Sequence, residues 1–371
     1  MKTIVADVCE ILDSQRIPIT ASNRVAGKYP YYGANGVQDY VADYLFDDEL
    51  VLLAEDGGNF GSKTKPIAYR ISGICWVNNH AHVLKPKPVV DVDYLCYSLM
   101  FYDVSALVNG ATRQKLTQAD MRKMVIPLRS MPEQKYIVDL LKKVDELISL
   151  RKKQLQKLDD LVKSRFVEMF GTYPVNEKKW ELGTIRKLVT EVRYGSSRKA
   201  AEGDSGKYPY LRMNNITYNG ELGFSDTKTI DIPDEELDKC TVRRGDLLFN
   251  RTNSKELVGK TCVYNRDERM VLAGFVVRVR LNDRALPEFV STFMNMAFSK
   301  QMLLNMCKTA IGQANINAQE LQDIGIYIPP IERQKDFISF KEQIIKSKLI
   351  VQKGLDKLDL LKQSLMQKYF A

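Results

Sequence analysis

The sequence predicts an α+β protein of two related halves, in each of which a mixed α/β globular region is followed by a long amphipathic helix. Three observations lead to this prediction: an internal repeat, short strand-like apolar runs between glycine turns, and two long apolar stripes at helical spacing. The 371 residues suffice for two or three domains at about 150 residues each. A composition with 44% hydrophobic and 27% charged residues is ordinary for a globular protein.

The internal repeat divides the chain into two halves. One short string occurs in both halves, as Gly27-Lys28-Tyr29-Pro30-Tyr31 and as Gly206-Lys207-Tyr208-Pro209-Tyr210. Towards the C-terminus the halves align without a gap, with matched residues 200 positions apart: Leu116 and Ile316, Gln134 and Gln334, Leu158 and Leu358, Phe170 and Phe370. Because the register is kept to the end of the chain, we interpret the halves as two copies of one arrangement.

The globular regions, 1–131 and 171–331, have the pattern of mixed α and β structure. Strand-like apolar runs occur at 50–54, 74–77, 246–250, 261–264 and 274–281, and glycine-containing turns separate them. Helical patterns follow at about 92–107 and 287–305. Both halves therefore have the same predicted order of strands, helix, short strand and long helix.

Each half ends in a long helical pattern, predicted over 133–170 and 331–371, in which apolar residues recur at four-three spacing. The first stripe consists of Ile137, Leu141, Val144, Ile148, Leu155, Leu158 and Val162, and the second of Phe337, Ile344, Val351, Leu355, Leu358 and Leu365. Leu140, Leu147, Leu161, Phe340 and Leu361 widen these stripes. Pro132 suits a first helical turn and Gly171 a helix end. So long a stripe must be buried, most simply against the sister helix; a dimerisation coil is the alternative.

Composition and motifs disfavour several classes of protein. No stretch of about 18 apolar residues is free of charges, and the N-terminus has no apolar signal segment, so we expect neither a membrane span nor secretion. The six cysteines form no C-x-x-C pair, and we expect them to be buried, reduced thiols in a cytoplasmic protein. The net charge of +9 favours a polyanionic partner.

Several local strings then point in one direction. The first half contains Tyr29-Pro30-Tyr31-Tyr32-Gly33-Ala34-Asn35-Gly36 and Trp76-Val77-Asn78-Asn79-His80-Ala81-His82-Val83-Leu84. The second contains Leu211-Arg212-Met213-Asn214-Asn215-Ile216 and Gly245-Asp246-Leu247-Leu248-Phe249-Asn250-Arg251-Thr252-Asn253-Ser254. A Gln-Lys pair opens each long helix, at 134–135 and 334–335. Over essentially its whole length, the chain resembles the DNA-specificity subunit of type I restriction–modification enzymes.

The resemblance implies a division of labour within the chain. Residues 1–131 and 171–331 would be two target recognition domains, each reading one part of a bipartite, asymmetric site on double-stranded DNA. The helices at 132–170 and 332–371 would pair as an antiparallel coiled coil that fixes the spacer, giving the chain a pseudo-two-fold axis.

The resemblance also implies partner subunits that carry the chemistry. Two modification subunits would bind S-adenosylmethionine and methylate adenine, and motor–nuclease subunits would use ATP and Mg²⁺. This chain itself would hold no cofactor and no active site.

Polar loops next to the predicted strands supply the candidate DNA contacts, because Arg, Lys, Asn and Ser pair with phosphates and base edges. In the first half the candidates are Tyr31, Tyr32, Asn35, Asn59, Ser62, Lys63, Thr64 and Lys65. In the second half they are Arg193, Tyr194, Ser196, Ser197, Arg198, Lys199, Arg212, Asn214, Asn250, Arg251, Thr252, Asn253, Ser254 and Lys260. The alternative for these segments is an ordinary solvated loop.

Motifs for catalysis and metal binding are incomplete. The glycine-rich segment before Lys63 fails the P-loop pattern because Ser62 takes the place of its last glycine. His80 and His82 fall on the same side of a strand, but no third ligand is close in sequence, so we predict no metal site. Two alternatives stay open: a DNA-binding coiled-coil protein that acts without partners, and an adenine methyltransferase or nuclease with unrecognised motifs.

Overall fold

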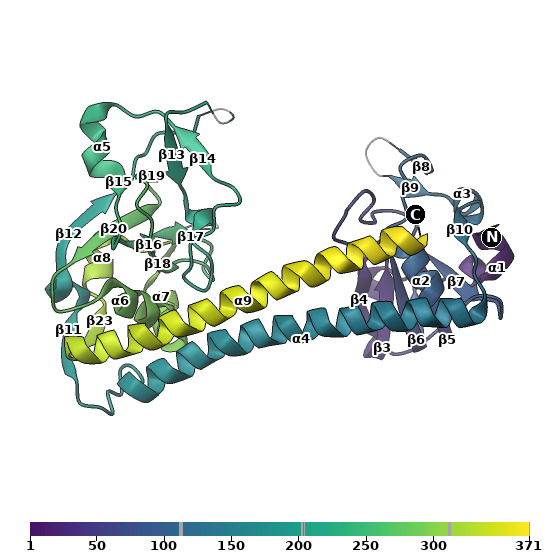
Figure 1. Cartoon of the computed structure of the whole chain (residues 1–371), viewed down its shortest axis with the longest axis horizontal. Coiled ribbons are helices and arrows are strands. Elements are labelled where there is room, and N and C mark those ends of the chain that lie inside the picture. Colours follow the sequence, from purple (N-terminus) through teal and green to yellow (C-terminus); the bar gives the residue numbers. More distant parts are fainter. Residues whose placement is uncertain (111–113, 202, 204, 311–312, 371) are drawn as a thin grey trace. The chain divides into compact units, whose positions relative to one another are not determined.

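The computed structural model describes residues 1–110, 114–201, 203, 205–310 and 313–370, with the backbone only at 308–310 and 313. The chain divides into two compact units. Unit 1 comprises Met1–Lys153 and Gln352–Ala371, and unit 2 comprises Gln154–Val351. Each unit therefore combines one globular region with parts of the two long helices, α4 (Met131–Phe170) and α9 (Ile331–Phe370), which are teal and yellow in Figure 1.

The globular part of unit 1 consists mainly of strands with short helices between them. Its strands are β1 (Lys2–Ile4), β2 (Cys9–Ile11), β3 (Ala26–Gly33), β4 (Gly36–Val41), β5 (Phe46–Ala54), β6 (Ala68–Val77), β7 (Ala81–Pro86), β8 (Val108–Asn109), β9 (Lys115–Leu116) and β10 (Val125–Pro127). Its helices are α1 (Val5–Val8), α2 (Val92–Met100), α3 (Gln118–Arg122) and the 3-10 helices η1 (Asp13–Gln15) and η2 (Ala21–Asn23).

In the described part of unit 1, the main sheet has six strands in the order β2-β7-β5-β6-β3-β4. β5 pairs antiparallel with β6 and β7, whereas β3 runs parallel to β6. Successive residues of β5 face opposite sides of the sheet. Leu50 and Leu52 belong to one hydrophobic core, and Val51 and Leu53 belong to another. Burial on both faces explains why the run predicted at 50–54 is continuously apolar.

Helix α2 covers one face of this sheet (Figure 1). It starts at Asp91, whose carboxylate accepts hydrogen bonds from two N–H groups of the first turn. The helix predicted to extend to about residue 107 ends at Met100, so that prediction was wrong at its C-terminus. Phe101 leaves the helical conformation, and the carboxylate of Asp103 then accepts the N–H of Ser105, which favours a turn.

Unit 2 has more and shorter elements. Its strands are β11 (Glu181–Thr184), β12 (Val189–Tyr194), β13 (Tyr208–Leu211), β14 (Lys228–Ile230), β15 (Thr241–Val242), β16 (Leu247–Asn250), β17 (Thr252–Asn253), β18 (Thr261–Val263), β19 (Met270–Leu272), β20 (Val276–Leu281), β21 (Lys308–Ala310), β22 (Gln313–Asn315) and β23 (Gly325–Ile328). Its helices are α5 (Asp234–Cys240), α6 (Pro287–Asn295), α7 (Ala297–Met306), α8 (Ala318–Gln322) and the 3-10 helices η3 (Ile185–Leu188) and η4 (Met213–Asn215).

Among the described residues of unit 2, two four-stranded sheets have the orders β12-β20-β16-β18 and β14-β13-β19-β15. In the first sheet, β20 pairs antiparallel with both β12 and β16. Leu247, Phe249 and Val277 face a large core together with α6 and the end of α4, whereas Leu248 and Val276 face a second core. The first sheet is therefore buried on both sides over β16, as β5 is in unit 1.

Several predicted elements of unit 2 differ from the structure. β16 starts at Leu247 because Asp246 accepts the N–H of Arg243 in the preceding turn. β20 starts at Val276, after a turn in which Gly274 donates its N–H to Ser196. The single helix predicted over 287–305 is two helices, α6 and α7, separated at Met296, whose ψ of 152° is extended.

The long helices begin and end close to the predicted residues. α4 starts with Pro132 in its first turn, and the carboxylate of Glu133 accepts hydrogen bonds from Ser130. Just after the helix, Gly171 adopts a φ of 83°, which favours glycine, and its N–H donates to the carbonyl of Val167. The predicted proline start and glycine end are confirmed. α9 starts at Ile331 as predicted and extends to Phe370; Ala371 lies outside the described residues.

The C-terminal end of each long helix packs into a globular core. The ring of Phe370, at the end of α9, lies 5.1 Å from that of Tyr94 in unit 1. The ring of Phe166, near the end of α4, lies 5.6 Å from that of Phe289 in unit 2. Each long helix therefore ends in the core of a globular region that it does not directly follow in sequence.

The predicted stripe residues are buried or half-buried within their own units. Of the five residues expected to widen the stripes, Leu140 and Phe340 are half-buried, whereas Leu147 is 47% exposed, Leu161 45% and Leu361 46%. A stripe at four-three spacing occupies a narrow face of a helix, so side chains beside it can point towards solvent. The widening was therefore wrong at these three leucines, which are surface residues.

Two further predictions concern single features. The cysteines are free thiols and five of them are buried, as expected. Burial raises the pKa of the Cys9 thiol to about 12. Within the described residues, no helix is both long and apolar enough to cross a bilayer.

Candidate nucleic-acid interface

One end of the β12-β20-β16-β18 sheet in unit 2 carries the predicted loop residue Arg251. This residue follows β16, and its N–H donates to the carbonyl of Phe275, just before β20, at 3.0 Å. The guanidinium carbon of Arg251 lies 5.0 Å from the ring centre of Tyr194, the last residue of β12. The Tyr194 hydroxyl accepts the N–H of Ala318 at 3.0 Å. Two residues predicted on different loops are thus brought into a cation–π contact.

The other candidate arginines of unit 2 are paired with carboxylates. The closest contacts are Arg193 to Glu191 at 3.1 Å, Arg198 to Glu236 at 2.7 Å and Arg212 to Asp226 at 2.7 Å. The hydrogen bond from Glu236, together with its charge, raises the pKa of Arg198. The pair Arg198 and Glu236 is exposed, and such a pair contributes little to stability because water screens it. Glu191 also pairs with the buried Arg278, and the side chain of Arg212 is half-buried.

Four candidates of unit 2 have buried side chains, which corrects their assignment as DNA contacts. Asn250 is 0% exposed, Ser196 4%, and Thr252 and Lys260 7% each. The ammonium of Lys260 donates to the carbonyl groups of Met213 and Ile216, and burial lowers the pKa of this lysine. Buried side chains at these positions cannot contact bases or phosphates.

The remaining candidates of unit 2 stay at the surface. Ser197, Lys199 and Asn214 are exposed, and Asn253 and Ser254 are half-buried. Asn253 accepts the N–H of Ser254, which shapes the loop after β17. These five side chains remain candidate DNA contacts, and they come from three separate loops.

In unit 1, the loop between β5 and β6 presents two lysines. Lys63, Thr64 and Lys65 are exposed. The hydroxyl of Ser62 accepts the N–H groups of Thr64 and Lys65, and the side-chain amide of Asn59 donates to the carbonyl of Pro66. Ser62 and Asn59 therefore hold the loop in shape, whereas the lysines are free to meet phosphates.

The two candidate tyrosines of β3 lie mainly inside unit 1. Tyr31 is only 1% exposed, and its hydroxyl exchanges hydrogen bonds with the backbone of Ile19. Its assignment as a DNA contact was therefore wrong. Tyr32 is half-buried beside Tyr69, with ring centres 5.9 Å apart. Asn35 is exposed and donates to the carbonyl of Gly57.

Next to Asn35 lies a polar hollow of about 490 Å³. Its lining includes Arg24, Gln38, Asn79 and His80. The imidazole Nδ1 of His80 lies 2.7 Å from a carboxylate oxygen of Asp56. Sequence reasoning missed Arg24 and Gln38. The position of Gln38 in β4, just after the Asn35-Gly36 turn, was the available signal for that residue.

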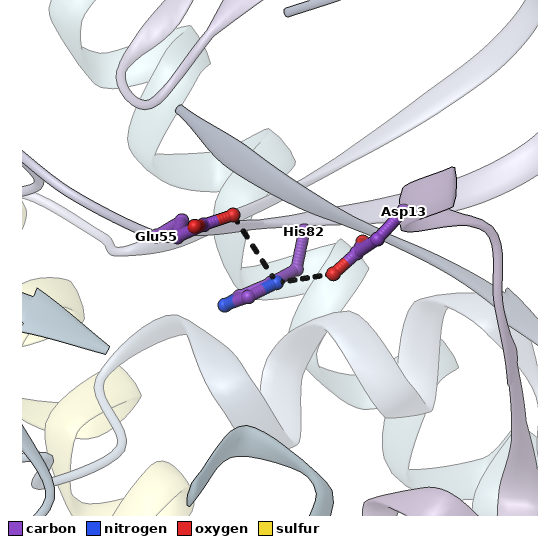
Figure 2. A group of neighbouring side chains, drawn as sticks. All are labelled: Asp13, Glu55 and His82. Carbon is purple, nitrogen blue, oxygen red and sulfur yellow. Dashed lines mark hydrogen bonds and ion pairs between the residues drawn. The ribbon is translucent and has the colours of Figure 1, made fainter. Parts of the chain in front are cut away.

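His82 sits in a buried cluster with two carboxylates that are distant in sequence. Figure 2 shows its imidazole between Asp13 and Glu55, with Nδ1 at 2.7 Å from one and 3.6 Å from the other. No acid is close to His82 in sequence, but the fold brings two carboxylates to it, one from η1 and one from the residue after β5. Each of the three side chains has one oxygen or nitrogen atom that could bind a metal ion, and these three atoms lie within 4.8 Å of one another.

The surroundings of this cluster favour a structural role over a metal site. Arg16 lies 2.6 Å and Lys115 2.9 Å from Glu55, so cations already occupy that carboxylate. The Nε2 of His82 lies 2.9 Å from the carbonyl oxygen of Leu116, so both ring nitrogens face oxygen acceptors. We interpret the cluster as a charge-balanced joint that fastens η1, β7 and β9 to one another.

The same joint shifts the pKa of Asp13. Burial raises this pKa, but hydrogen bonds from His82, Gln118 and the N–H of Val83 outweigh the burial, and the net shift is downward. The ionised carboxylate is therefore the form that the fold of unit 1 accommodates.

Solved structures share this fold. The S subunit of a type I restriction–modification system from M. genitalium aligns with a TM-score of 0.54 and 13% identity, covering 100% of this chain and 96% of that one. A second solved structure concerns complex assembly and conformational transition of the type I R-M system. One of its chains aligns with a TM-score of 0.59 and 15% identity, and the alignment covers 100% of this chain and 97% of that one.

Proteins that are similar to this chain in sequence are also type I specificity subunits. The EcoKI type I restriction enzyme specificity subunit of Escherichia coli K12 is 25% identical over 346 residues, 87% of this chain and 74% of that subunit. A putative type I specificity subunit of Haemophilus influenzae, S.HindORF215P, is 36% identical over 143 residues, 38% and 37% of the two chains. The model of the type I restriction modification DNA specificity domain matches residues 2–160 and 177–359. The chain therefore belongs to the family of type I restriction–modification DNA specificity domains.

Proposed function

We propose that this chain is the DNA sequence-recognition subunit of a type I restriction–modification complex, and that each globular region reads one half of a bipartite, asymmetric site. The observation that carries this proposal is a repeated framework with unlike loops. In each unit a strand pair, β1 with β10 or β11 with β23, precedes a long helix. The exposed candidates differ, with Lys63 and Lys65 in one unit and Ser197 and Lys199 in the other. Equivalent frameworks with unlike surfaces suit two unlike half-sites.

The two long helices would act as the spacer between the half-sites, as an antiparallel coiled coil. Contacts within each unit support this pairing. In unit 1, Lys362 lies 2.6 Å from Asp145, and in unit 2, Lys348 lies 2.6 Å from Asp159. As residue numbers rise along α4, those of the partners fall along α9, which is the order of an antiparallel pair. The pseudo-two-fold repeat of the chain follows from the same arrangement.

Exposed apolar side chains on the long helices support the docking of two copies of one partner. Leu150 and Ile350 are 59% and 73% exposed, and Leu161 and Leu361 are 45% and 46% exposed. The two members of each pair are related by the repeat. Unit 1 contains Leu150 and Leu361, and unit 2 contains Leu161 and Ile350, so each unit has one residue of each pair. Because these exposed positions recur in both units, they suit contacts with the same surface on two copies of a partner. We assign them to two modification subunits that carry S-adenosylmethionine, with motor–nuclease subunits that use ATP and Mg²⁺ joining the complex.

Methylome mapping tests the proposal. The chain is co-expressed with its methyltransferase subunit in a host that lacks other adenine methylation, and methylated adenines are located by long-read sequencing. We expect one asymmetric motif of two specific blocks with a fixed unspecific spacer. Methylation by the purified chain with S-adenosylmethionine alone would make it an enzyme instead. Failure to co-purify with the methyltransferase, combined with specific DNA binding, would support a stand-alone DNA-binding protein.

A further inference from the structure

We propose that Arg251, Tyr194 and Phe275 form one base-reading cluster in unit 2, in which Arg251 reads a guanine, Tyr194 positions it, and Phe275 contacts the methyl group of a neighbouring thymine. The proposal rests on the proposed function, because it assumes that unit 2 reads one DNA half-site. It adds a specificity-determining role for Phe275, an aromatic residue that no loop pattern in the sequence singled out.

Strand register brings the three residues together at one end of the sheet. Phe249 and Tyr194 both pair with Val277, on the two sides of β20. Arg251 lies just after β16, and Phe275 lies in the turn just before β20, beyond the paired residues Asn250 and Val276. The hydrogen bond from the N–H of Arg251 to the carbonyl of Phe275 continues the ladder by one step.

Arg251 differs from the other candidate arginines of unit 2 in its partners. Arg193, Arg198 and Arg212 each face a carboxylate. Across the described residues, the side chain of Arg251 has no carboxylate within ion-pair distance, and its buried Nε has no hydrogen-bond partner. An unpaired guanidinium at a surface keeps the donor fork that matches the O6 and N7 acceptors of guanine. This makes Arg251 the best-prepared base reader among the four.

Tyr194 fixes the direction of that fork. Its ring lies under the guanidinium at 5.0 Å, and its hydroxyl is held by the N–H of Ala318 at the start of α8. The ring is therefore anchored to a second element and cannot rotate freely away from Arg251. A long arginine side chain loses much conformational entropy on binding, and a preset orientation reduces that loss. Tyr194 is a positioning residue in this arrangement.

Phe275 supplies an apolar surface beside the arginine. It is 53% exposed, although it directly precedes β20, whose first residues are fully buried. Burial of an exposed aromatic ring on complex formation is favourable, and the thymine methyl group is the apolar feature of the major-groove edge. Because Phe275 and Arg251 are adjacent across the strand pair, their targets should be adjacent base pairs.

The experiment uses the complex of this chain with its methyltransferase subunit, and duplexes that carry the methylome-defined motif. In the half-site assigned to unit 2, guanine is replaced by 7-deazaguanine, which lacks the N7 acceptor, and thymine by uracil, which lacks the methyl group. We expect each replacement to weaken wild-type binding about tenfold, within the range for one base contact. Arg251→Lys should become indifferent to 7-deazaguanine, and Phe275→Ala indifferent to uracil.

Two further variants separate positioning from folding. Tyr194→Leu removes the ring and should reduce discrimination at the same guanine as Arg251→Lys, whereas Tyr194→Phe keeps the ring and should retain most of it. Arg266 lies over Phe224 at 3.7 Å elsewhere in unit 2, so Phe224→Leu is a matched control that should leave base discrimination unchanged. Thermal unfolding of each variant shows whether the fold is kept.

The outcomes distinguish this inference from the proposed function. If no bipartite motif is methylated, the proposed function fails. If a motif exists but wild-type binding is indifferent to both base analogues in either half-site, the reading cluster is overturned and the proposed function stands. Equal sensitivity of Phe275→Ala and wild type to uracil overturns the role of Phe275, even when Arg251 behaves as expected.

Discussion

Gln134 and Gln334, which are 200 positions apart in the sequence, make the same three side-chain hydrogen bonds in their own units. Both are 0% exposed. In each case the side-chain oxygen accepts an N–H at the start of a short helix, and the side-chain nitrogen donates to two carbonyl groups. The N–H belongs to Asp91 for Gln134 and to Leu286 for Gln334. The carbonyl groups belong to Val89 and Arg129 for Gln134, and to Arg284 and Pro329 for Gln334. Each glutamine thereby ties the first turn of a long helix to the segment that starts α2 or α6.

The first prediction is that Gln134→Ala destabilises unit 1 by about 3 kcal/mol, because it leaves three buried backbone groups without partners. Gln334→Ala should do the same to unit 2. Urea unfolding gives the free energy, and hydrogen exchange assigns the loss to a unit. Gln156→Ala, which removes an exposed contact within α4 to Asp160, is the matched control and should change little. A loss of similar size in the control would mean that the buried amide has no special role.

The second prediction concerns acid stability. The folded-state pKa of Asp13 lies below its ordinary value of 3.8, so its contribution is fully present above about pH 4 and is lost as the pH falls through the folded-state pKa. Asp13→Asn removes this dependence. It should also destabilise unit 1 at pH 7 by about 3 kcal/mol, because His82 loses its charged partner in a buried site.

Urea titrations at pH 7 and near pH 3 check both effects. The wild type should lose more stability between these two values than Asp13→Asn does. Asp139→Asn, at an exposed position of α4 in the same unit, is the control. A wild type and an Asp13→Asn variant with parallel pH profiles would show that the joint does not depend on this carboxylate.

The repeat explains why the framework could be predicted from sequence while the site could not. Matched positions predicted both long helices. They did not single out the short helices α3 and α8, although both start from side-chain caps, at Thr117 and Asn317. Periodicity of this kind is local. The joint around His82 joins residues 69 positions apart, and no local pattern carries that information. Loop candidates such as Asn250 and Tyr31 were misjudged because polarity suggests exposure, whereas burial depends on which face of a strand meets a core.

The third prediction separates phosphate contacts from base contacts. Lys63→Ala and Lys65→Ala should weaken DNA binding without altering the methylated motif, because these exposed lysines face phosphates in our proposal. Each change should reduce the slope of log K against log salt by about 0.9. Affinity measured from low to moderate salt gives the slope. Lys2→Ala, also exposed in unit 1, should leave it unchanged. A new motif in either variant would mean that the lysine reads a base.

The last prediction tests the helices as the spacer. Four residues are inserted after Asp160 in α4, and four after Ser347 in α9. The pair of Asp145 and Lys362 then lies on one side of the inserts, and the packing of Arg165 on Phe340 lies on the other side, so the seam can re-form. The inserts add about 6 Å of helix and about 40° beyond one turn. One base pair rises about 3.4 Å, so the methylated motif should gain one or two unspecific base pairs, with both specific blocks unchanged. Long-read methylome sequencing measures this directly, and an insertion after Asp43, in the exposed loop between β4 and β5, is the control. A constant spacer, or altered bases in either block, would make the helices docking elements that do not set the spacing.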